Sequence, residues 1–315
     1  MMPENLQAAA ARSGRYRWRI VALLFFAATI NYLDRSVLGI LAPVLQDTYH
    51  WTEIEYSRIV TAFQVAYGLG VFFSGKLLDR FGSRIVFALA VGLWSLAGAA
   101  HALARTVLGF SMARFFLGLG ESANFPASVK TVAEWFPQKE RAFVTGLFNA
   151  GSTVGAVAAP LIVPWITIRY GWEWAFIITG SVGFIWLIFW LKIYTLPEKN
   201  KKIGAEELAY IKTGREKAPE KISWMKVITK KPALIICMAR FLTDPVWWFL
   251  LFWLPKFLDT RYNISISDVG LPLVIIYLAA DFGGIGGGWL SSYLIKNGKG
   301  VNHARKTAML VCALF

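Results

Sequence analysis

The 315-residue sequence predicts an all-α membrane protein, and three observations support this fold class. Hydrophobic residues make up 56% of the chain and charged residues only 17%, with a mean hydropathy of +0.50. A soluble domain of this size needs far more polar surface than this composition supplies. Apolar runs of membrane-spanning length recur along the chain, and lysine and arginine gather in alternate loops between them.

Eight apolar runs are long enough to cross a bilayer. A transmembrane helix needs about 20 predominantly apolar residues, because the hydrocarbon core is about 30 Å thick. The runs that meet this length are 20–45, 59–78, 85–103, 107–132, 143–168, 175–193, 233–258 and 269–295. A ninth run begins at 308–315. We therefore expect eight helical spans and the start of another.

Positive charge marks one side of the membrane, within a net charge of +14. The cations of the alternate loops are Arg12, Arg15, Arg17, Arg19, Lys76, Arg80, Arg84, Lys139 and Arg141, followed by ten lysines and arginines between 197 and 232. The opposite loops are often acidic, as at Asp47, Glu53 and Glu55. The positive-inside rule predicts a cytoplasmic N-terminus and linker. Because topology explains this excess of cations, we expect no binding of nucleic acid.

The order of spans and polar segments predicts two bundles. Residues 1–195 form a predicted six-helix N-terminal bundle, 196–232 a cytoplasmic linker, and 233–315 part of a C-terminal bundle with spans 7, 8 and the start of 9. The linker contains "GAEELAYIKTGREKA", an amphipathic stretch expected to be helical. Since the second bundle stops within its third span, we expect the sequence to be part of a longer transporter.

Polar residues inside the spans predict a shared cavity. A charged side chain at the bilayer centre costs at least about 2.5–3.5 kcal/mol, so it is normally paired or lines a wet space. Polar stripes on several helices converge on a common cavity more readily than each faces lipid. The stripes contain Asn31, Asp34 and Arg35; Gln64 and Tyr67; Arg114, Glu121 and Asn124; Asn149, Ser152 and Thr153; Arg240 and Asp244; and Tyr277 and Asp281.

Each group also has a purely structural interpretation. Adjacent residues point about 100° apart on a helix, so Asp34 and Arg35 each need another partner, which favours function over a packing ion pair. For Arg114 the sequence leaves two roles open, a bridge between helices or snorkelling at the end of a span. The deeper position of Glu121 favours a functional role. The candidates Tyr32, Tyr67, Asn149 and Ser152 are of types that more often form hydrogen bonds between packed helices than contacts to a substrate. Asp244 and Asp281 are candidates for proton sites or gates, and the sequence does not choose.

Several motifs resemble a known transporter superfamily. "GKLLDRFGSR" resembles the signature loop of the major facilitator superfamily, with Gly75, Asp79, Arg80, Gly82 and Arg84 at the motif positions. "NYLDR" and "RFFLGLGESANFPASVKTVAEWFPQKER" are similar to its anion:cation symporter family. "FNAGSTVGAVAAP" and "ARFLTDPVWWFLLFWLP" resemble the bacterial hexuronate and aldonate transporters of that family. The resemblance covers essentially the whole chain and implies the major facilitator fold of two six-helix bundles, the second incomplete here.

The resemblance also implies roles for individual residues. The residues it places at the substrate are Arg35, Tyr32 and Tyr67, with Asn149 and Ser152 as further candidates. Position 152 departs from relatives that carry a longer amide. The resemblance assigns proton coupling to Asp34 and Glu121, with Arg114 as the partner of Glu121, and gating to the signature loop. We expect Arg35 to lie beside a water-accessible hollow.

These features predict proton-coupled symport of a sugar acid, a hexuronate or an aldonate, across the bacterial inner membrane by alternating access. Moving a monoanion into a cell works against about 2.3 kcal/mol per charge per 100 mV, so uptake needs a co-transported cation. The alternatives are the same fold carrying another organic anion, such as a dicarboxylate or aromatic acid, or coupling to Na⁺. A transporter-like anion sensor is the alternative from another class.

Enzymatic activity is not expected. The sequence has no H-E-x-x-H, G-x-S-x-G or phosphate-loop motif, and His50, His101 and His303 lie at or outside span ends. Cys237 and Cys312 fall inside predicted spans, so we expect neither a disulfide framework nor a metal site. No cofactor is implied. The expected partners are a small organic anion, protons and the lipid bilayer, and the protein is expected to be a monomer.

Overall fold

The computed structural model describes residues 16–213, 226 and 229–314, and the described part is built from helices. Arg12, Arg15 and the end of the amphipathic linker stretch lie outside these residues. Helices α2, α3, α4, α5, α6 and α7 span Tyr16–Tyr49, Glu53–Ala100, Val107–Glu121, Asn124–Trp135, Gln138–Tyr170 and Trp172–Ile193. Helices α8, α10, α11 and α12 span Ala205–Lys212, Lys231–Tyr262, Gly270–Lys296 and Val301–Leu314. Short 3₁₀ turns cover His101–Leu103 and Pro197–Lys199.

Among the described residues, five helices are long and apolar enough to cross a membrane: α2, α3, α6, α7 and α10. This count differs from the eight predicted spans for local reasons. Helix α3 contains both 59–78 and 85–103, while span 107–132 is divided between two shorter helices. The predicted span 269–295 corresponds to α11, within which Gly270–Ala280 is a shorter apolar segment among the residues that the structure describes.

A glycine turn divides α3 into two arms. Gly82 has φ 78° and ψ 162°, a backbone conformation that side chains with a Cβ rarely adopt. Phe73 and Leu89, one on each arm, line the same groove, so the two arms lie side by side. The helix begins with a capping box. The Thr52 hydroxyl accepts a hydrogen bond from the Glu55 backbone N–H, and the Glu55 carboxylate accepts one from the Thr52 backbone N–H. The two predicted spans are therefore present within one labelled helix.

A proline interrupts the fourth span. Helix α4 ends at Glu121 and α5 starts at Asn124. Pro126 lacks an N–H, and its ring would collide with the carbonyl of Ser122 in a continuous helix. At the break, the Ser122 hydroxyl donates a hydrogen bond to the carbonyl of Leu119, 2.6 Å away, which satisfies one of the carbonyls at the end of α4. The break leaves Glu121 at the end of a helix in the middle of the bundle.

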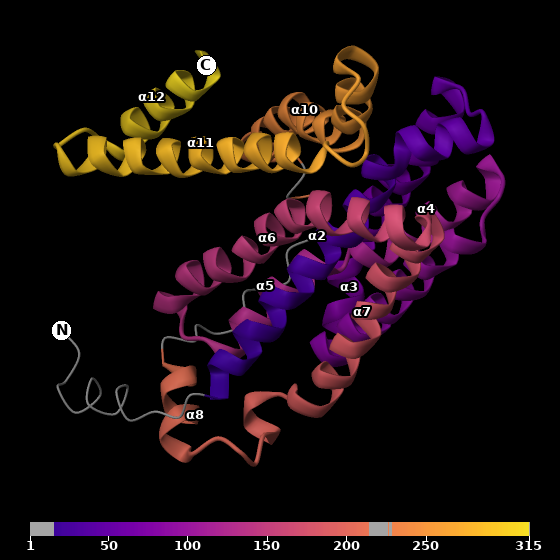
Figure 1. Ribbon diagram of the computed structural model, residues 1–315. Coiled ribbons are helices and arrows are strands. Elements are labelled where there is room, and N and C mark those ends of the chain that lie inside the picture. The colour runs from indigo at the N-terminus through magenta and orange to yellow at the C-terminus, as the bar shows by residue number, and fades with distance from the viewer. Residues whose placement is uncertain (1–15, 214–225, 227–228, 315) are drawn as a thin grey trace.

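The first bundle is close-packed around α2, which contacts α6 and α7, while α3 packs along α4 (Figure 1). Small residues make the close approaches. A Cβ added to Gly118 of α4 would lie 2.5 Å from the carbonyl oxygen of Phe63 in α3. One added to Gly120 would lie 2.8 Å from the backbone N of Trp94. Because these two glycines have no side chain, α4 can pack closely against α3.

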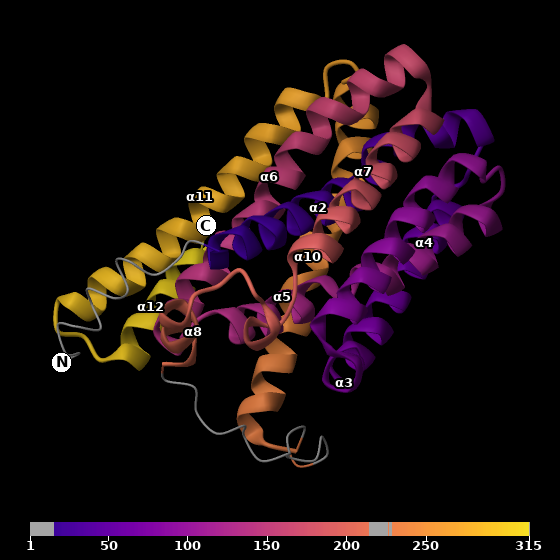
Figure 2. The ribbon, with the colours of Figure 1, turned by 90° about the horizontal axis from the view of Figure 1, so that it is seen from below.

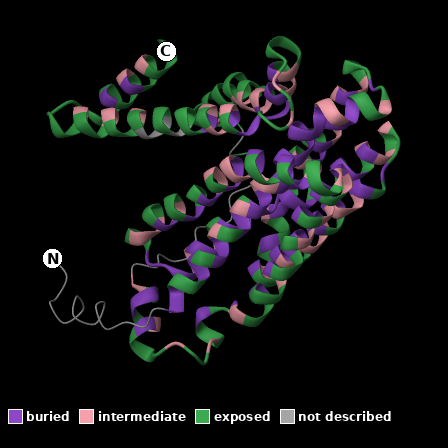
Figure 3. Ribbon diagram, in the orientation of Figure 1, coloured by how far each residue is buried: buried purple, intermediate pink, exposed green. Residues whose placement is uncertain are grey.

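The second group of helices, α10 to α12, contacts the first bundle at one end and at its centre. We call the end that carries α8 and the start of α2 the linker end, and the opposite end the far end. At the far end the Tyr56 hydroxyl donates to the Phe252 carbonyl at 2.8 Å, and Lys256 pairs with Glu53. Figure 2, which is turned by 90° from Figure 1, shows α10 crossing behind the first bundle. In Figure 1, α11 diverges from α6 toward α12, and Figure 3 shows most of α11 and α12 exposed.

The linker helix α8 docks on the linker end of the first bundle. Glu207 accepts a hydrogen bond from the backbone N of Arg17 at 3.3 Å, and the Tyr210 hydroxyl donates to Glu140. The Arg17 guanidinium carbon lies 4.6 Å from the centre of the Tyr210 ring. Burial raises the pKa of the Glu207 carboxyl, opposed by the Arg17 backbone N–H and charge. Burial, with the Glu140 hydrogen bond, raises the pKa of Tyr210 to about 12.

Gly118→Ala is expected to destabilise the protein by about 1–3 kcal/mol, because overpacking forces α4 away from α3. The matched control is Gly146→Ala in α6, where an added Cβ meets nothing within 4 Å. The control is expected to be neutral or to stabilise by up to about 1 kcal/mol, because alanine favours helix over glycine. Thermal unfolding in detergent measures both. Equal shifts in the two variants would show that α4 and α3 do not approach this closely.

Docking of α8 is expected to weaken as pH rises. Because the pKa of Glu207 is raised in the docked state, docking is strongest when the carboxyl is protonated and is lost as pH increases through that raised value. Amide hydrogen exchange in α8, corrected for intrinsic rates, is expected to be faster at pH 8 than at pH 5. Glu207→Gln should flatten this difference, whereas Glu206→Gln on the exposed neighbour should preserve it. A pH difference that survives Glu207→Gln would exclude Glu207 as its source.

Candidate functional site

A buried ion pair between α2 and α4 forms the centre of the candidate site. The Arg35 Nε donates to Glu121 Oε2 at 2.8 Å, and both side chains are almost fully buried. The Arg35 Nη2 donates to Asn31 Oδ1 at 3.1 Å, one helical turn earlier on α2. Asn31 and Arg35 therefore lie on one helix face, as the sequence predicts.

Four aromatic rings enclose the Arg35 guanidinium. Its carbon lies 4.9 Å from the ring centre of Tyr32, 4.8 Å from Tyr67, 5.4 Å from Phe63 and 5.2 Å from Trp248. Aromatic faces attract a cation within about 6 Å and do so more strongly away from water. The predicted substrate residues Tyr32 and Tyr67 thus surround Arg35. Trp248 comes from α10, so the second group of helices completes the enclosure.

The expected pair between Glu121 and Arg114 is wrong, because Glu121 pairs with Arg35. Seven residues on a helix span about 10 Å, so Arg114 and Glu121 share a face of α4 without reaching each other. The two terminal nitrogens of Arg114 instead donate to the backbone carbonyl of Arg35 at 3.3 and 3.4 Å. Arg114 has no exposed surface, which excludes snorkelling in this structure. It bridges α4 to α2.

Asp34 faces away from its neighbour Arg35. Asp34 is 3% exposed, and neither carboxyl oxygen has a partner at full hydrogen-bond geometry within the described part of the chain. The hydroxyl of Thr179 on α7 faces it. Glu121 Oε1 likewise has no partner among the described residues. Buried polar atoms are nearly always hydrogen-bonded, so these carboxyl oxygens call for a chemical explanation.

A small cavity adjoins this centre and lies between the two groups of helices. Its volume is about 140 Å³, and its wall contains Tyr32, Asn149, Ser152, Thr153, Ala156, Trp247 and Tyr277. Tyr32 belongs both to this wall and to the enclosure of Arg35. The expected open hollow beside Arg35 is corrected: Arg35 is only 2% exposed and does not line the cavity, whereas Tyr32 contacts both.

The sequence reasoning missed two tryptophans of this site. Trp247 lines the cavity and Trp248 contacts Arg35, yet neither was selected from the motif "DPVWWF". Aromatic residues are common in membrane spans, so the pair gave no distinct signal. The only available signal was its place beside Pro245, in a segment that also holds Arg240 and Asp244.

Other predicted polar residues lie apart from this centre. Gln64, Arg240 and Asp244 line a wider groove of about 650 Å³, and Arg240 pairs with Asp244 at 3.2 Å on an exposed face. The side chain of Asp281 is outside those the structure describes. In the described ranges, no cluster of three histidine, cysteine or acidic residues is arranged to hold a metal ion.

The signature-loop residues gather at the linker end, away from Arg35. Asp79 pairs with Lys130 of α5 at 2.7 Å, and Lys130 also donates to the Leu78 carbonyl at 2.8 Å. The Arg84 Nη2 donates to the carbonyl of Leu191 near the end of α7 at 2.7 Å. Gly82 provides the turn, Arg80 stacks on the ring of Phe81, and an added Cβ at Gly75 meets open space. The loop therefore ties the turn of α3 to α5 and to the end of α7.

The sequence of this chain is similar to those of several known proteins. A profile described as the Major Facilitator Superfamily matches residues 24–315. The chain is 33% identical to a galacturonate transporter of Dickeya chrysanthemi, over 87% of this chain and 81% of that protein. It is 34% identical to a hexuronate transporter of Escherichia coli strain K12, over 94% of this chain and 69% of that protein. A D-galactonate transporter of Escherichia coli O6:H1 is 30% identical, over 97% of this chain and 74% of that protein.

A solved structure is similar in fold. It is a bacterial homolog of the human lysosomal transporter Spinster in an inward-facing and unoccupied conformation, with a TM-score of 0.73 at 20% identity. The match covers 90% of this chain and 64% of that one, so the chain spans about two thirds of its length. At this level of identity the likeness concerns the fold alone.

Proposed function

The chain belongs to the major facilitator superfamily, and from this premise we propose that it transports a sugar acid, a hexuronate or an aldonate, across the bacterial inner membrane. The predicted fold and family are thereby confirmed, and the relatives named above are transporters rather than enzymes. The observation that carries the proposal is the buried Arg35–Glu121 pair beside a cavity walled by both groups of helices.

Arg35 is the proposed anchor for the substrate carboxylate. A guanidinium presents a planar fork of donors that matches a carboxylate in two parallel hydrogen bonds. An incoming acid competes with Glu121 for this fork after Tyr32 moves aside. Asn149, Ser152 and Thr153 on the cavity wall offer hydrogen bonds to sugar hydroxyls, while Trp247 and Tyr277 provide apolar faces for the ring.

Competition for Arg35 supports proton coupling. When the substrate takes the guanidinium, Glu121 stays in a dry space without its counter-charge, which costs several kcal/mol for an ion. A bound proton removes that charge, so substrate and proton favour each other's binding. Asp34, buried without a hydrogen-bonding partner among the described residues, is the second proposed proton carrier. Arg114 helps to hold the local charge balance through its contact with the Arg35 backbone.

We assign the linker end to the cytoplasm, because the basic loops lie there. The division into 1–195, 196–232 and 233–315 then makes alternating access a movement of two bundles around the central site. The contacts Tyr56–Phe252 and Glu53–Lys256 would hold the outer side closed, and the divergence of α11 from α6 would leave the inner side open. The signature-loop residues at the inner side are the proposed gate. The monomeric state stays a prediction.

A counterflow assay in proteoliposomes tests the substrate class. Vesicles loaded with unlabelled galacturonate, glucuronate or galactonate are expected to accumulate the matching labelled acid transiently, while dicarboxylates and aromatic acids compete poorly. Accumulation driven by an imposed pH gradient, but unaffected by a sodium gradient, is expected for proton coupling. Preference for a non-sugar acid would contradict the substrate class. Binding of a sugar acid without counterflow would identify a sensor instead.

Two substitutions separate binding from coupling. Arg35→Gln is expected to weaken substrate binding at least thirtyfold, since loss of one member of a buried charged contact costs about 2–5 kcal/mol. Glu121→Gln is expected to preserve counterflow while abolishing accumulation driven by a pH gradient, because the side chain no longer exchanges a proton. Calorimetric binding and the two transport assays measure these effects.

Controls address folding and general charge loss. Arg105→Gln removes a half-exposed cation paired with Glu173 at 3.7 Å and should leave binding unchanged. The double variant Arg35→Gln/Glu121→Gln leaves no unpaired charge from this pair, so its thermal stability reports whether the weaker binding of Arg35→Gln reflects misfolding. Unchanged affinity in Arg35→Gln would remove Arg35 from the substrate site.

A further inference from the structure

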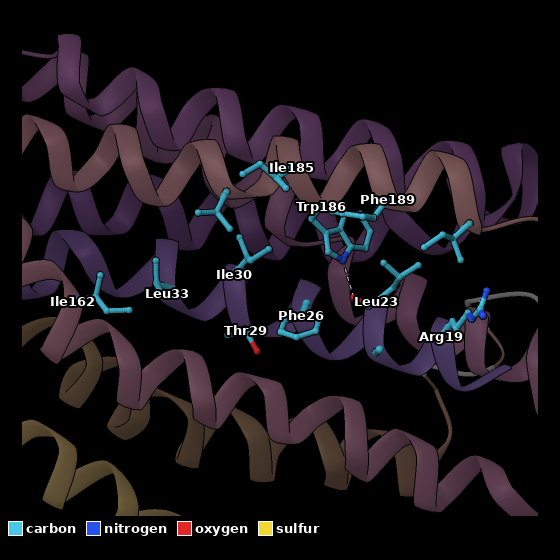
Figure 4. A pocket seen from close by; sticks show the side chains of 13 residues that line it. Arg19, Leu23, Phe26, Thr29, Ile30, Leu33, Ile162, Ile185, Trp186 and Phe189 are labelled. Atoms are coloured by element: carbon cyan, nitrogen blue, oxygen red, sulfur yellow. Dashed lines mark hydrogen bonds between the residues drawn. The ribbon is translucent and has the colours of Figure 1, made fainter. Parts of the chain in front are cut away.

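An apolar groove runs along the outside of the first bundle, apart from the transport site. It lies between α2 and α7 with one residue of α6 at its far rim, and its volume is about 630 Å³. Figure 4 shows its wall, in which Phe26, Ile185 and Phe189 are each more than half exposed. Apolar side chains open to this extent are expected to be covered by another apolar group.

Most polar atoms in the groove are already bonded within the protein. The indole N–H of Trp186 donates to the Leu23 carbonyl at 2.7 Å, as the dashed line in Figure 4 marks. The Thr29 hydroxyl donates to the Phe25 carbonyl at 3.0 Å. Among the lining residues, the one charged group is Arg19, at the linker end of the groove. The groove therefore presents an apolar channel with a cation at one mouth.

The length and level of the groove correspond to one leaflet of a bilayer. On α2 its wall extends from Arg19 to Leu33, a rise of about 21 Å along the helix. It thus occupies the half of α2 nearer the linker end. Half of a hydrocarbon core is about 15 Å, which leaves room for a headgroup at Arg19. Trp18, 39% exposed beside Arg19, is a residue type enriched at the membrane interface.

We propose that this groove binds one anionic phospholipid of the cytoplasmic leaflet. One acyl chain lies between α2 and α7, and the phosphate is paired with the Arg19 guanidinium. The apolar wall fits a hydrocarbon chain, and the single cation is complementary to a phosphate. A partner helix would bring polar ends of its own, whereas the lining away from Arg19 is apolar apart from Thr29 and Trp186, whose polar groups are bonded within the protein. The site is independent of Arg35 and of the cavity beside it.

Native mass spectrometry of the delipidated protein tests the proposal with phosphatidylglycerol and phosphatidylcholine of identical chains. Wild type is expected to bind one phosphatidylglycerol about fivefold more tightly than phosphatidylcholine. This ratio corresponds to the attraction of about 1 kcal/mol between one lysine or arginine and anionic lipid. Arg19→Gln should abolish this preference without removing the binding of either lipid. Ala22→Trp, which places an indole in the groove, should lower the binding of both lipids.

Matched variants make the result specific. Lys212→Gln removes an exposed cation of α8 at the same end, and Leu96→Trp adds an indole to an exposed position of α3 outside the groove. Both should bind phosphatidylglycerol as wild type does. The proposal is overturned if Lys212→Gln loses the preference as Arg19→Gln does, or if Ala22→Trp binds both lipids normally. A protein dimer that Ala22→Trp dissociates would identify a second copy as the occupant and overturn it too.

Discussion

The buried contact between Arg35 and Glu121 is the constraint around which the first bundle is arranged. A guanidinium and a carboxylate are costly to remove from water, and their attraction compensates only when the geometry is close and other donors are satisfied. Asn31 takes one further guanidinium N–H, and four aromatic faces surround the cation. The glycine at position 118 brings α4 against α3 closely enough for Glu121 to reach inward. The pair therefore joins α2 to α4 at a place where α4 also packs closely against α3.

The same centre links the two groups of helices. Trp248 of α10 lies 5.2 Å from the Arg35 guanidinium, and Phe252 lies 5.9 Å from that of Arg114. Both arginines belong to the first bundle, so movement of α10 changes the surroundings of two buried cations. A shift in their charge balance therefore changes the free energy of the contact between the bundles. This link gives a physical route from a bound anion to a change of bundle arrangement.

Much of this architecture could be predicted from sequence because lipid imposes simple rules. The apolar runs, the alternation of basic loops and the turn at Gly82 follow from hydropathy, charge and backbone freedom. The break near Pro126 was less visible, since the surrounding span stays apolar on both sides. At the site, a charged pair in the middle of an apolar run pointed directly to Asp34 and Arg35. The partner of Glu121 could not be assigned the same way, because it depends on how α2 meets α4 rather than on spacing within α4.

Tyr32 has a consequence for the timing of events at the site. Its side chain borders both the cavity that a solute could occupy and the cation proposed to hold the solute's acid group. In the proposed function, long-range attraction would bring an anion as far as the cavity, and contact with the buried guanidinium would require an aromatic side chain to rotate. Residence near the site and capture by it would then be separate events, and the slower one would belong to the protein rather than to diffusion.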